Sequence, residues 1–339
     1  MGSLRVGELQ VFRPQDGTHD YEEFPVGDPM HWTVHDIVDA SLYILETSEG
    51  RRVLGDLATL IVKARQRAGQ MCLYPPEDDF DDDMDRHIRA FLRKLRTSFP
   101  EVYIMKNAVE ATTVREKGPF GPTLGEVQPY QVAKMKLCAM AMYDILRTQS
   151  EGDRKKYMFH MIVAVTHELC HVLTGYLIGE GRPRTPGTVE IEGMSREAGF
   201  YLEMKLFGGI LDCFAALPAR DGDPLDPHQP GVSYFFENAT DTAKGRPISG
   251  RFIEDFVNSR GAMGLHIQVD MRMPERSRGG RRRETASMNR FRLDAMNAID
   301  TARRATVTRP GEATLGSSSS TFRYRMLPQE ADYYGSHWR

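Results

Sequence analysis

The feature that most constrains this chain is the apolar stretch Met158–Tyr176, M-F-H-M-I-V-A-V-T-H-E-L-C-H-V-L-T-G-Y. Its apolar residues recur at spacings of three and four, which predicts a helix. The helix is apolar nearly all round, so we expect it to be buried in the core. Gly175 and Gly179 lie where such a helix is expected to stop.

Two histidines and a glutamate interrupt this apolar stretch, in the order His167-Glu168-Leu169-Cys170-His171. Residues four apart lie on the same face of a helix, so both imidazoles would face one metal ion. Glu168 would act as general base, and the pattern is typical of a zinc hydrolase with one zinc ion per chain. The alternative is a buried polar cluster that is satisfied by hydrogen bonds alone.

Composition and charge place the chain in the globular class. Of its 339 residues, 40% are hydrophobic and 27% are charged, and the net charge of -3 argues against a general nucleic-acid binder. We find no uninterrupted run of about 18 apolar residues, so no membrane span is expected. The N-terminus lacks an apolar signal core, and the four cysteines form no C-x-x-C pair or disulfide framework. These features predict a reduced, cytoplasmic protein.

The order of polar and apolar segments predicts four regions. Residues 1–30 read as an extended surface arm, and residues 31–273 as the catalytic domain with an N-terminal helical part. Residues 274–290 are a basic, flexible loop. Residues 291–339 hold a helix, a linker and an aromatic tail, which we expect to dock on the body of the protein or on a partner.

Hydrophobic periodicity locates the remaining elements, and together they predict an α+β fold that is predominantly helical. An acidic run at residues 77–85 suits the first turn of a helix better than a calcium loop. Ser195 is the expected N-cap of a helix that ends at Phe207. Helices are predicted at residues 32–47, 53–68, 128–147, 194–207 and 251–257, and strands at residues 102–105, 109–114, 188–191, 232–236 and 265–269.

A catalytic zinc ion usually has three protein ligands, so one more must come from elsewhere in the chain. Glu197 is favoured because it lies in a predicted helix, where the small neighbours Ala198 and Gly199 would allow a close approach to the motif. Glu190, eighteen residues after the second histidine of the motif, is the next candidate. Glu203 would be an outer-sphere partner of a histidine ligand, and Glu192 reads as a surface acid.

The H-E-x-x-H element and the downstream Glu-Ala-Gly resemble the zincin superfamily of metallopeptidases, in its gluzincin-like branch. The resemblance covers about residues 158–207 and identifies no particular family. The metzincin pattern is excluded, because Thr174 and Leu177 replace its Gly and His, and Tyr201 replaces the Asp of the thermolysin pattern. The resemblance implies a zincin-like core with a small sheet, the motif helix and a following helix that carries the glutamate.

The predicted function is therefore that of a zinc-dependent metallopeptidase or amide hydrolase. Glu168 would take a proton from a metal-activated water, which attacks a carbonyl, and would pass the proton to the leaving amine. Tyr234 and His266 are open candidates for the oxyanion donor. One alternative is a zincin-like hydrolase, lyase or cyclase that acts on a small molecule, and another is a non-catalytic, metal-bound interaction protein.

Overall fold

The computed structural model describes most of the chain up to residue 259. The described ranges are 6–15, 20–74, 80–106, 110–116, 118, 120–179, 189–191, 194–196, 198–214, 228–236 and 246–259. The basic loop, the aromatic tail and the strand predicted at residues 265–269 lie outside them. Within the described residues the fold is mixed α+β and mostly helical, as predicted.

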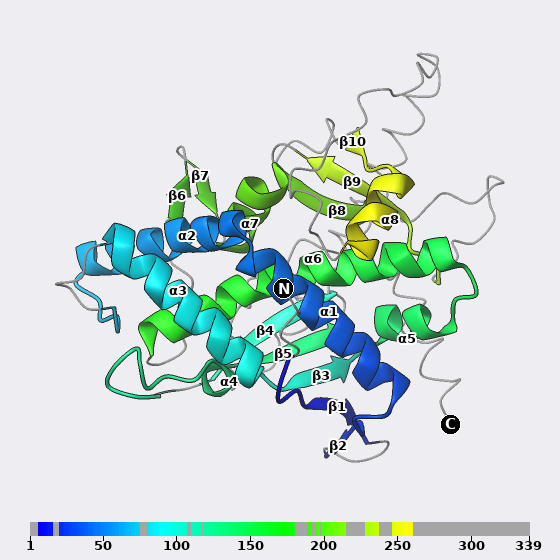
Figure 1. Ribbon diagram of the computed structural model, residues 1–339, viewed down its shortest axis with the longest axis horizontal. Helices are drawn as coiled ribbons and strands as arrows, with labels where there is room; N and C mark the ends of the chain where they lie inside the picture. Colours follow the sequence, from blue (N-terminus) through cyan, green and yellow to red (C-terminus); the bar gives the residue numbers. More distant parts are fainter. Residues whose placement is uncertain are drawn as a thin grey trace, which may run out of the picture.

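A five-stranded mixed sheet forms one side of the molecule (Figure 1). Its strand order is β2-β1-β3-β5-β4, so β4 lies at one edge. β3 pairs in parallel with β1 and β5, whereas β4 runs antiparallel to β5. The strands are β1 Val11–Pro14, β2 Tyr21–Glu23, β3 Val102–Met105, β4 Ala111–Arg115 and β5 Ala133–Cys138.

Part of the predicted N-terminal arm therefore belongs to this sheet. β1 and β2 form an antiparallel pair, and Val11 is fully buried beside Val102 of β3. Val11 is buried and the next residue, Phe12, is half-buried, as expected for a strand with one face on the core.

The helices pack on the other side of the sheet and around a central helix. This central helix, α6, contacts α1, α5, α7, α8 and β4 (Figure 1). The helices are α1 Pro29–Glu46, α2 Ser48–Arg67, α3 Phe80–Thr97, α4 Pro129–Val132, α5 Ala139–Arg147, α6 Glu151–Ile178, α7 Ala198–Phe207 and α8 Gly250–Asn258.

Helix α6 is the predicted motif helix, and its ends have clear local causes. The Ser150 side chain caps the N-terminus by accepting from the backbone N–H of Asp153 at 3.2 Å. Gly179 ends the helix in the left-handed conformation with φ 67°, which glycine adopts without strain. Gly175 does not end it but lies within the last turns, against the side chain of Val132.

Burial of α6 is nearly complete from Tyr157 onwards. Among the described helices α6 is long and apolar enough to cross a membrane, although its sequence contains no uninterrupted apolar run of that length. Its whole apolar window is buried inside the protein, which is typical of a core helix.

A three-stranded sheet packs beside α6 on the side away from the larger sheet (Figure 1). Its strand order is β10-β9-β8, and helix α8 follows β10 and packs on α6. A two-stranded hairpin precedes α7. These strands are β6 Val189–Ile191, β7 Met194–Arg196, β8 Ile210–Phe214, β9 Val232–Phe236 and β10 Arg246–Pro247.

Two of the predicted helices are wrong in part. Residues 128–147 form α4, β5 and α5 instead of one helix, because Ala133–Cys138 completes the sheet between β3 and β4. The predicted helix at residues 194–207 begins at Ala198. Ser195 is not its N-cap but pairs with Glu190 in the hairpin.

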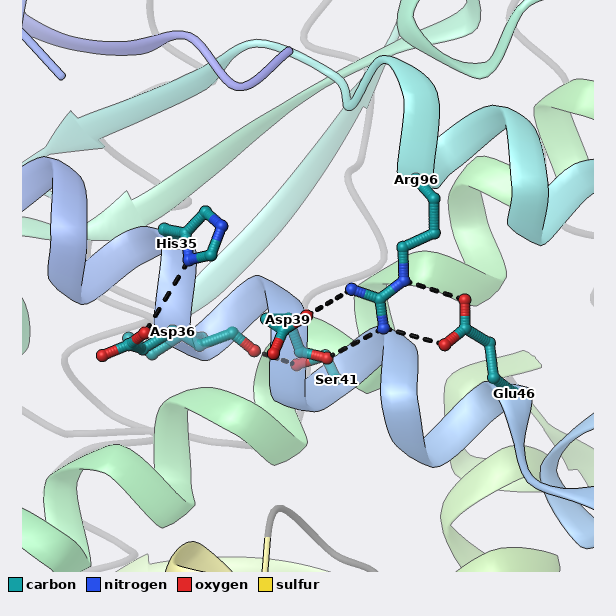
Figure 2. Close-up of polar contacts among 7 residues, drawn as sticks. His35, Asp36, Asp39, Ser41, Glu46 and Arg96 are labelled. Carbon is teal, nitrogen blue, oxygen red and sulfur yellow. Dashed lines mark hydrogen bonds and ion pairs between the residues drawn. The ribbon is translucent and has the colours of Figure 1, made fainter. Parts of the chain in front are cut away.

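A buried charge cluster joins α3 to α1 (Figure 2). The Arg96 guanidinium donates to both carboxylate oxygens of Glu46 at 2.8 Å and also contacts the carboxylate of Asp39. Burial alone would lower the pKa of Arg96, but the hydrogen bonds and charges of Glu46 and Asp39 outweigh it and raise this pKa. The cluster thus fixes the position of α1, whose Ser41 hydroxyl donates to the Ile162 carbonyl of α6 at 3.0 Å.

Candidate metal centre

The three motif side chains meet inside the core, as the helical spacing requires. One potential ligand atom from each of His167, Glu168 and His171 can be chosen such that all three lie within 4.8 Å of one another. The three residues are between 0% and 2% exposed. The two imidazole ring centroids are 5.7 Å apart, with 57° between the ring planes. Each ring has its Nδ1 atom engaged by another element of the fold.

The partner of His167 is Glu203 on α7. The Nδ1 atom of His167 lies 2.5 Å from Oε1 of Glu203, and Oε2 of this glutamate accepts from the backbone N–H of Leu211 at 3.0 Å. A carboxylate is an acceptor, so the Nδ1 atom carries the proton and donates it. The lone pair of the neutral ring is then on Nε2, which is the atom that would bind a metal. Glu203 thus makes the predicted contact with a candidate ligand.

The partner of His171 is Arg115, at the end of β4. The Nη2 atom of Arg115 lies 3.0 Å from Nδ1 of His171. A guanidinium can only donate, so this hydrogen bond requires Nδ1 to accept. The two histidines of the motif therefore have opposite hydrogen-bond roles at the same ring atom.

The carboxylate of Glu168 is held by the edge strand of the larger sheet. Its Oε2 atom accepts from the backbone N–H of Thr113 at 2.7 Å, and the Thr113 hydroxyl donates to the Glu168 carbonyl at 3.1 Å. Its Oε1 atom is buried and makes no hydrogen bond within the described part of the chain. One oxygen is thus anchored, and the other is left for a ligand or a proton. Burial of such an oxygen is unfavourable unless something binds it.

Helix α7 approaches the motif at Gly199. A Cβ atom at this position would lie 2.2 Å from Nε2 and 2.3 Å from both Cδ2 and Cε1 of His167. These nearly equal distances place the added carbon over the face of the ring, because an atom in line with Nε2 would be farther from the two carbons. The small residue is therefore needed for α7 to bring Glu203 to His167, and the predicted close approach is confirmed.

The contacts of the described side chains do not identify a third metal ligand. Glu197, the favoured candidate, is outside the described residues. The backbone of Glu190 is paired with Ser195 in the hairpin before α7, but its side chain is not among those described. Of the two possible oxyanion donors, Tyr234 lies on β9 and His266 is outside the described residues.

Sequence reasoning missed the two residues from β4. Thr113 and Arg115 lie 55 and 56 residues before the motif residues that they contact. A threonine and an arginine in a short strand carry no signal of their own. Only the pairing of β4 with β5, which the wrongly predicted helix concealed, brings them to the motif.

The residue types of the cluster could hold a metal ion. Two imidazole nitrogens and a carboxylate oxygen lie on one buried surface, and zinc is bound by such nitrogen and oxygen ligands. The carboxylate that fixes the His167 ring is the usual outer-sphere partner of a metal-binding histidine. No protein-family model, curated protein or solved structure matches the chain.

Proposed function

We propose that this protein is a zinc-dependent hydrolase of the metallopeptidase type. The observation that carries the proposal is the buried cluster of His167, Glu168 and His171, with its potential ligand atoms within 4.8 Å. The Nε2 atoms of the two histidines would hold the ion, with Glu197 as the third ligand. When bound, the zinc ion would polarise a carbonyl group and make a water molecule more acidic.

Glu168 would be the general base. The bond from the Thr113 N–H fixes Oε2 and thereby orients the whole carboxylate. Oε1 would take the proton of the attacking water and then deliver it to the leaving nitrogen. The burial of this side chain excludes bulk water, so the proton would pass between two bound groups.

The arrangement of the elements supports a zincin-like core. Helix α6 contacts the edge strand β4 of the larger sheet, and the following helix α7 brings a glutamate to the motif. The resemblance implies a helix with a metal-binding glutamate after the motif helix. α7 instead brings Glu203, which contacts Nδ1 of His167, and begins one residue after the proposed ligand Glu197.

The edge strand favours an extended substrate such as a peptide. Two backbone bonds flank the pairing of β4 with β5: Cys138 N–H at the end of β5 donates to the Glu110 carbonyl, and Glu116 N–H donates to the carbonyl of Val132, the residue before β5. Backbone groups alternate along a strand, so those of the odd-numbered residues Ala111, Thr113 and Arg115 point away from β5. The outward N–H of Thr113 already donates to Glu168, so an extended chain would pair with the other outward backbone groups of this edge.

The burial of the motif favours a second candidate, an enzyme that acts on a small amide or ester. All three motif side chains are at most 2% exposed. A substrate that reached these side chains in this conformation would have to be small. A peptide would require a change of conformation that exposes them. The two candidates share the same chemistry and differ only in the substrate.

Metal content and one conservative variant test the proposal. The purified full-length protein should bind about one zinc ion per chain, as expected for one set of ligands. Glu168→Gln should keep the zinc and lose at least about a hundredfold in hydrolysis, since it removes the general base. Glu151→Gln on the same helix is the matched control, because Glu151 is exposed. A wild type that takes up no zinc under metal-replete conditions would refute the proposal.

Hydrolysis assays with the same purified protein distinguish the two classes of substrate. Labelled casein and a mixture of peptides would be compared with small amides and esters, each with and without a chelator. Chelator-sensitive cleavage of peptides alone would support the peptidase. Cleavage of small amides or esters alone would support the second candidate, and full activity of Glu168→Gln would contradict both.

A further inference from the structure

The contact between Arg115 and His171 conflicts with ordinary metal binding. We infer that Arg115 is a positioning residue that restrains metal binding: its hydrogen bond to Nδ1 of His171 must break before Nε2 binds a zinc ion. The inference rests on the proposed zinc site. It assigns a role to a residue that is neither a ligand nor the general base.

The first step concerns the proton on the His171 ring. The guanidinium has five donors, no acceptor, and no tendency to give up its proton. With Nη2 of Arg115 at 3.0 Å, Nδ1 of His171 must be the acceptor. A neutral imidazole that accepts at Nδ1 carries its proton on Nε2, the atom that would bind the metal.

The second step is a comparison with the other histidine of the motif. His167 donates from Nδ1 to Glu203, which leaves the lone pair on Nε2 for a metal. Metal-binding histidines ordinarily have such an acceptor at the second nitrogen. The hydrogen bond of His167 therefore suits metal binding through Nε2, whereas that of His171 does not.

The third step is what zinc binding would require. Coordination through Nε2 moves the proton of the neutral ring to Nδ1, where it would face the N–H groups of Arg115. Two donors would then face each other at 3.0 Å, and the positive charge of Arg115 would also oppose the cation. Arg115 lies at the end of an edge strand and is only half-buried, so its side chain has a way out towards solvent.

Zinc affinity measures this restraint directly. The full chain and its variants would compete for zinc with a chromogenic chelator at constant pH. Arg115→Gln removes the charge and supplies an amide oxygen that can accept from Nδ1–H, so it should bind zinc at least about tenfold more tightly, the usual scale for such outer-sphere partners. Arg115→Lys keeps a cation that can only donate and should gain less. Arg13→Gln, which removes an exposed arginine of β1, should leave the affinity unchanged.

The opposite result would overturn the inference. If Arg115 instead stabilised the ring while the metal was bound, Arg115→Gln would bind zinc more weakly than the wild type. If the wild type binds zinc and Arg115→Gln binds it equally or more weakly, the inference about Arg115 is wrong and the proposed function stands. No binding by any of the proteins would remove both.

A second readout does not depend on a folded Arg115 variant. In the metal-free wild type, histidine ¹⁵N spectra should show Nδ1 of His171 without a proton and Nδ1 of His167 with one. His171→Gln assigns the signal, and Arg115→Gln should move the proton to Nδ1. A protonated Nδ1 of His171 in the metal-free wild type would overturn the inference even if every Arg115 variant failed to fold.

Discussion

The carboxylate of Glu203 and the imidazole of His167 lie 2.5 Å apart, and both side chains are fully buried. This bond joins α7 to α6 at the centre of the candidate site. Because Oε2 of the same glutamate also accepts from the Leu211 N–H, the contact links the start of β8 to the motif helix. The orientation of one candidate ligand therefore depends on the packing of two further elements.

The first prediction concerns this carboxylate. Glu203→Gln keeps the size of the side chain, but it places an NH₂ group opposite one of two donors, the His167 Nδ1–H or the Leu211 N–H. We expect a loss of about 1–3 kcal/mol in the free energy of unfolding, the range for an unsatisfied buried polar group. Zinc affinity should fall by about 10- to 100-fold. Urea denaturation in the presence of a chelator and zinc competition measure the two effects.

Glu254→Gln is the control for this variant, since Glu254 is exposed on α8 and pairs only at the surface with Lys155. It should change neither quantity measurably. A Glu203→Gln protein with unchanged stability and unchanged zinc affinity would show that the buried bond has no role in holding His167.

The second prediction concerns Gly199. Gly199→Ala would place a carbon atom 2.2–2.3 Å from three atoms of the His167 ring, so the ring or helix α7 must shift. We expect a loss of about 1–3 kcal/mol, as for an overpacked core, together with weaker zinc binding. Thermal unfolding with and without zinc would measure both, since a ligand that binds the folded chain stabilises it.

The same substitution at Gly55 provides a control of opposite sign. Gly55 lies within α2, where an added Cβ meets nothing closer than the Met84 side chain at 3.8 Å. Gly55→Ala should stabilise the protein by about 0.5–1 kcal/mol, because alanine favours a helix more than glycine does. Equal effects of the two substitutions would contradict the close approach at Gly199.

The motif helix was predictable because local patterns specify it. Apolar residues at spacings of three and four and a terminal glycine all act within one segment, and the structure has α6 from Glu151 to Ile178. The contact between Gly199 and His167 was also predictable, because a small residue beside a candidate ligand suggests a close approach.

The contacts of β4 were not predictable, because they depend on which strands pair. Residues Ala133–Cys138 alternate between apolar and lysine side chains, but the apolar residues from Val132 to Ile145, Met135 and Leu137 among them, predict one helix through this stretch. In the structure they form the strand that joins β3 to β4, and the partners of Glu168 and His171 follow from this pairing. Such long-range pairing overrides local helical preference.

The third prediction concerns the charge cluster in Figure 2. Arg96→Met removes the guanidinium that binds the buried carboxylate of Asp39 and the partly exposed carboxylate of Glu46. We expect a loss of about 3–5 kcal/mol in the free energy of unfolding, as for breaking a buried ion pair from one side. Urea denaturation measures it.

Arg13→Met is the matched control, because Arg13 forms an exposed ion pair with Glu22 at 2.7 Å. This substitution should cost less than about 1 kcal/mol. A similar small loss for Arg96→Met would mean that the cluster does not fix α1 against α3.

The fourth prediction is a pH dependence that arises from His160 on α6. Burial, with a smaller contribution from the charge of Lys156, lowers the pKa of His160 from its usual 6.5 to about 3. Its Nε2 atom lies 2.7 Å from the Ser233 hydroxyl of β9, so the neutral ring has a partner in the folded protein. The unfolded chain binds a proton here below about pH 6.5, and the folded chain does not until about pH 3.

Stability from this group is therefore complete above about pH 6.5 and is lost as the pH falls towards 3. Between pH 7 and pH 5 the free energy of unfolding should fall by about 2 kcal/mol from this group. The slope is about 1.4 kcal/mol for each pH unit below the unfolded pKa. His160→Gln keeps a polar group for Ser233 but does not titrate, so its free energy of unfolding should fall less over this range by the same amount. Urea denaturation of both proteins at the two pH values, with a chelator present, measures the difference. Parallel pH profiles would show that His160 is not the group responsible.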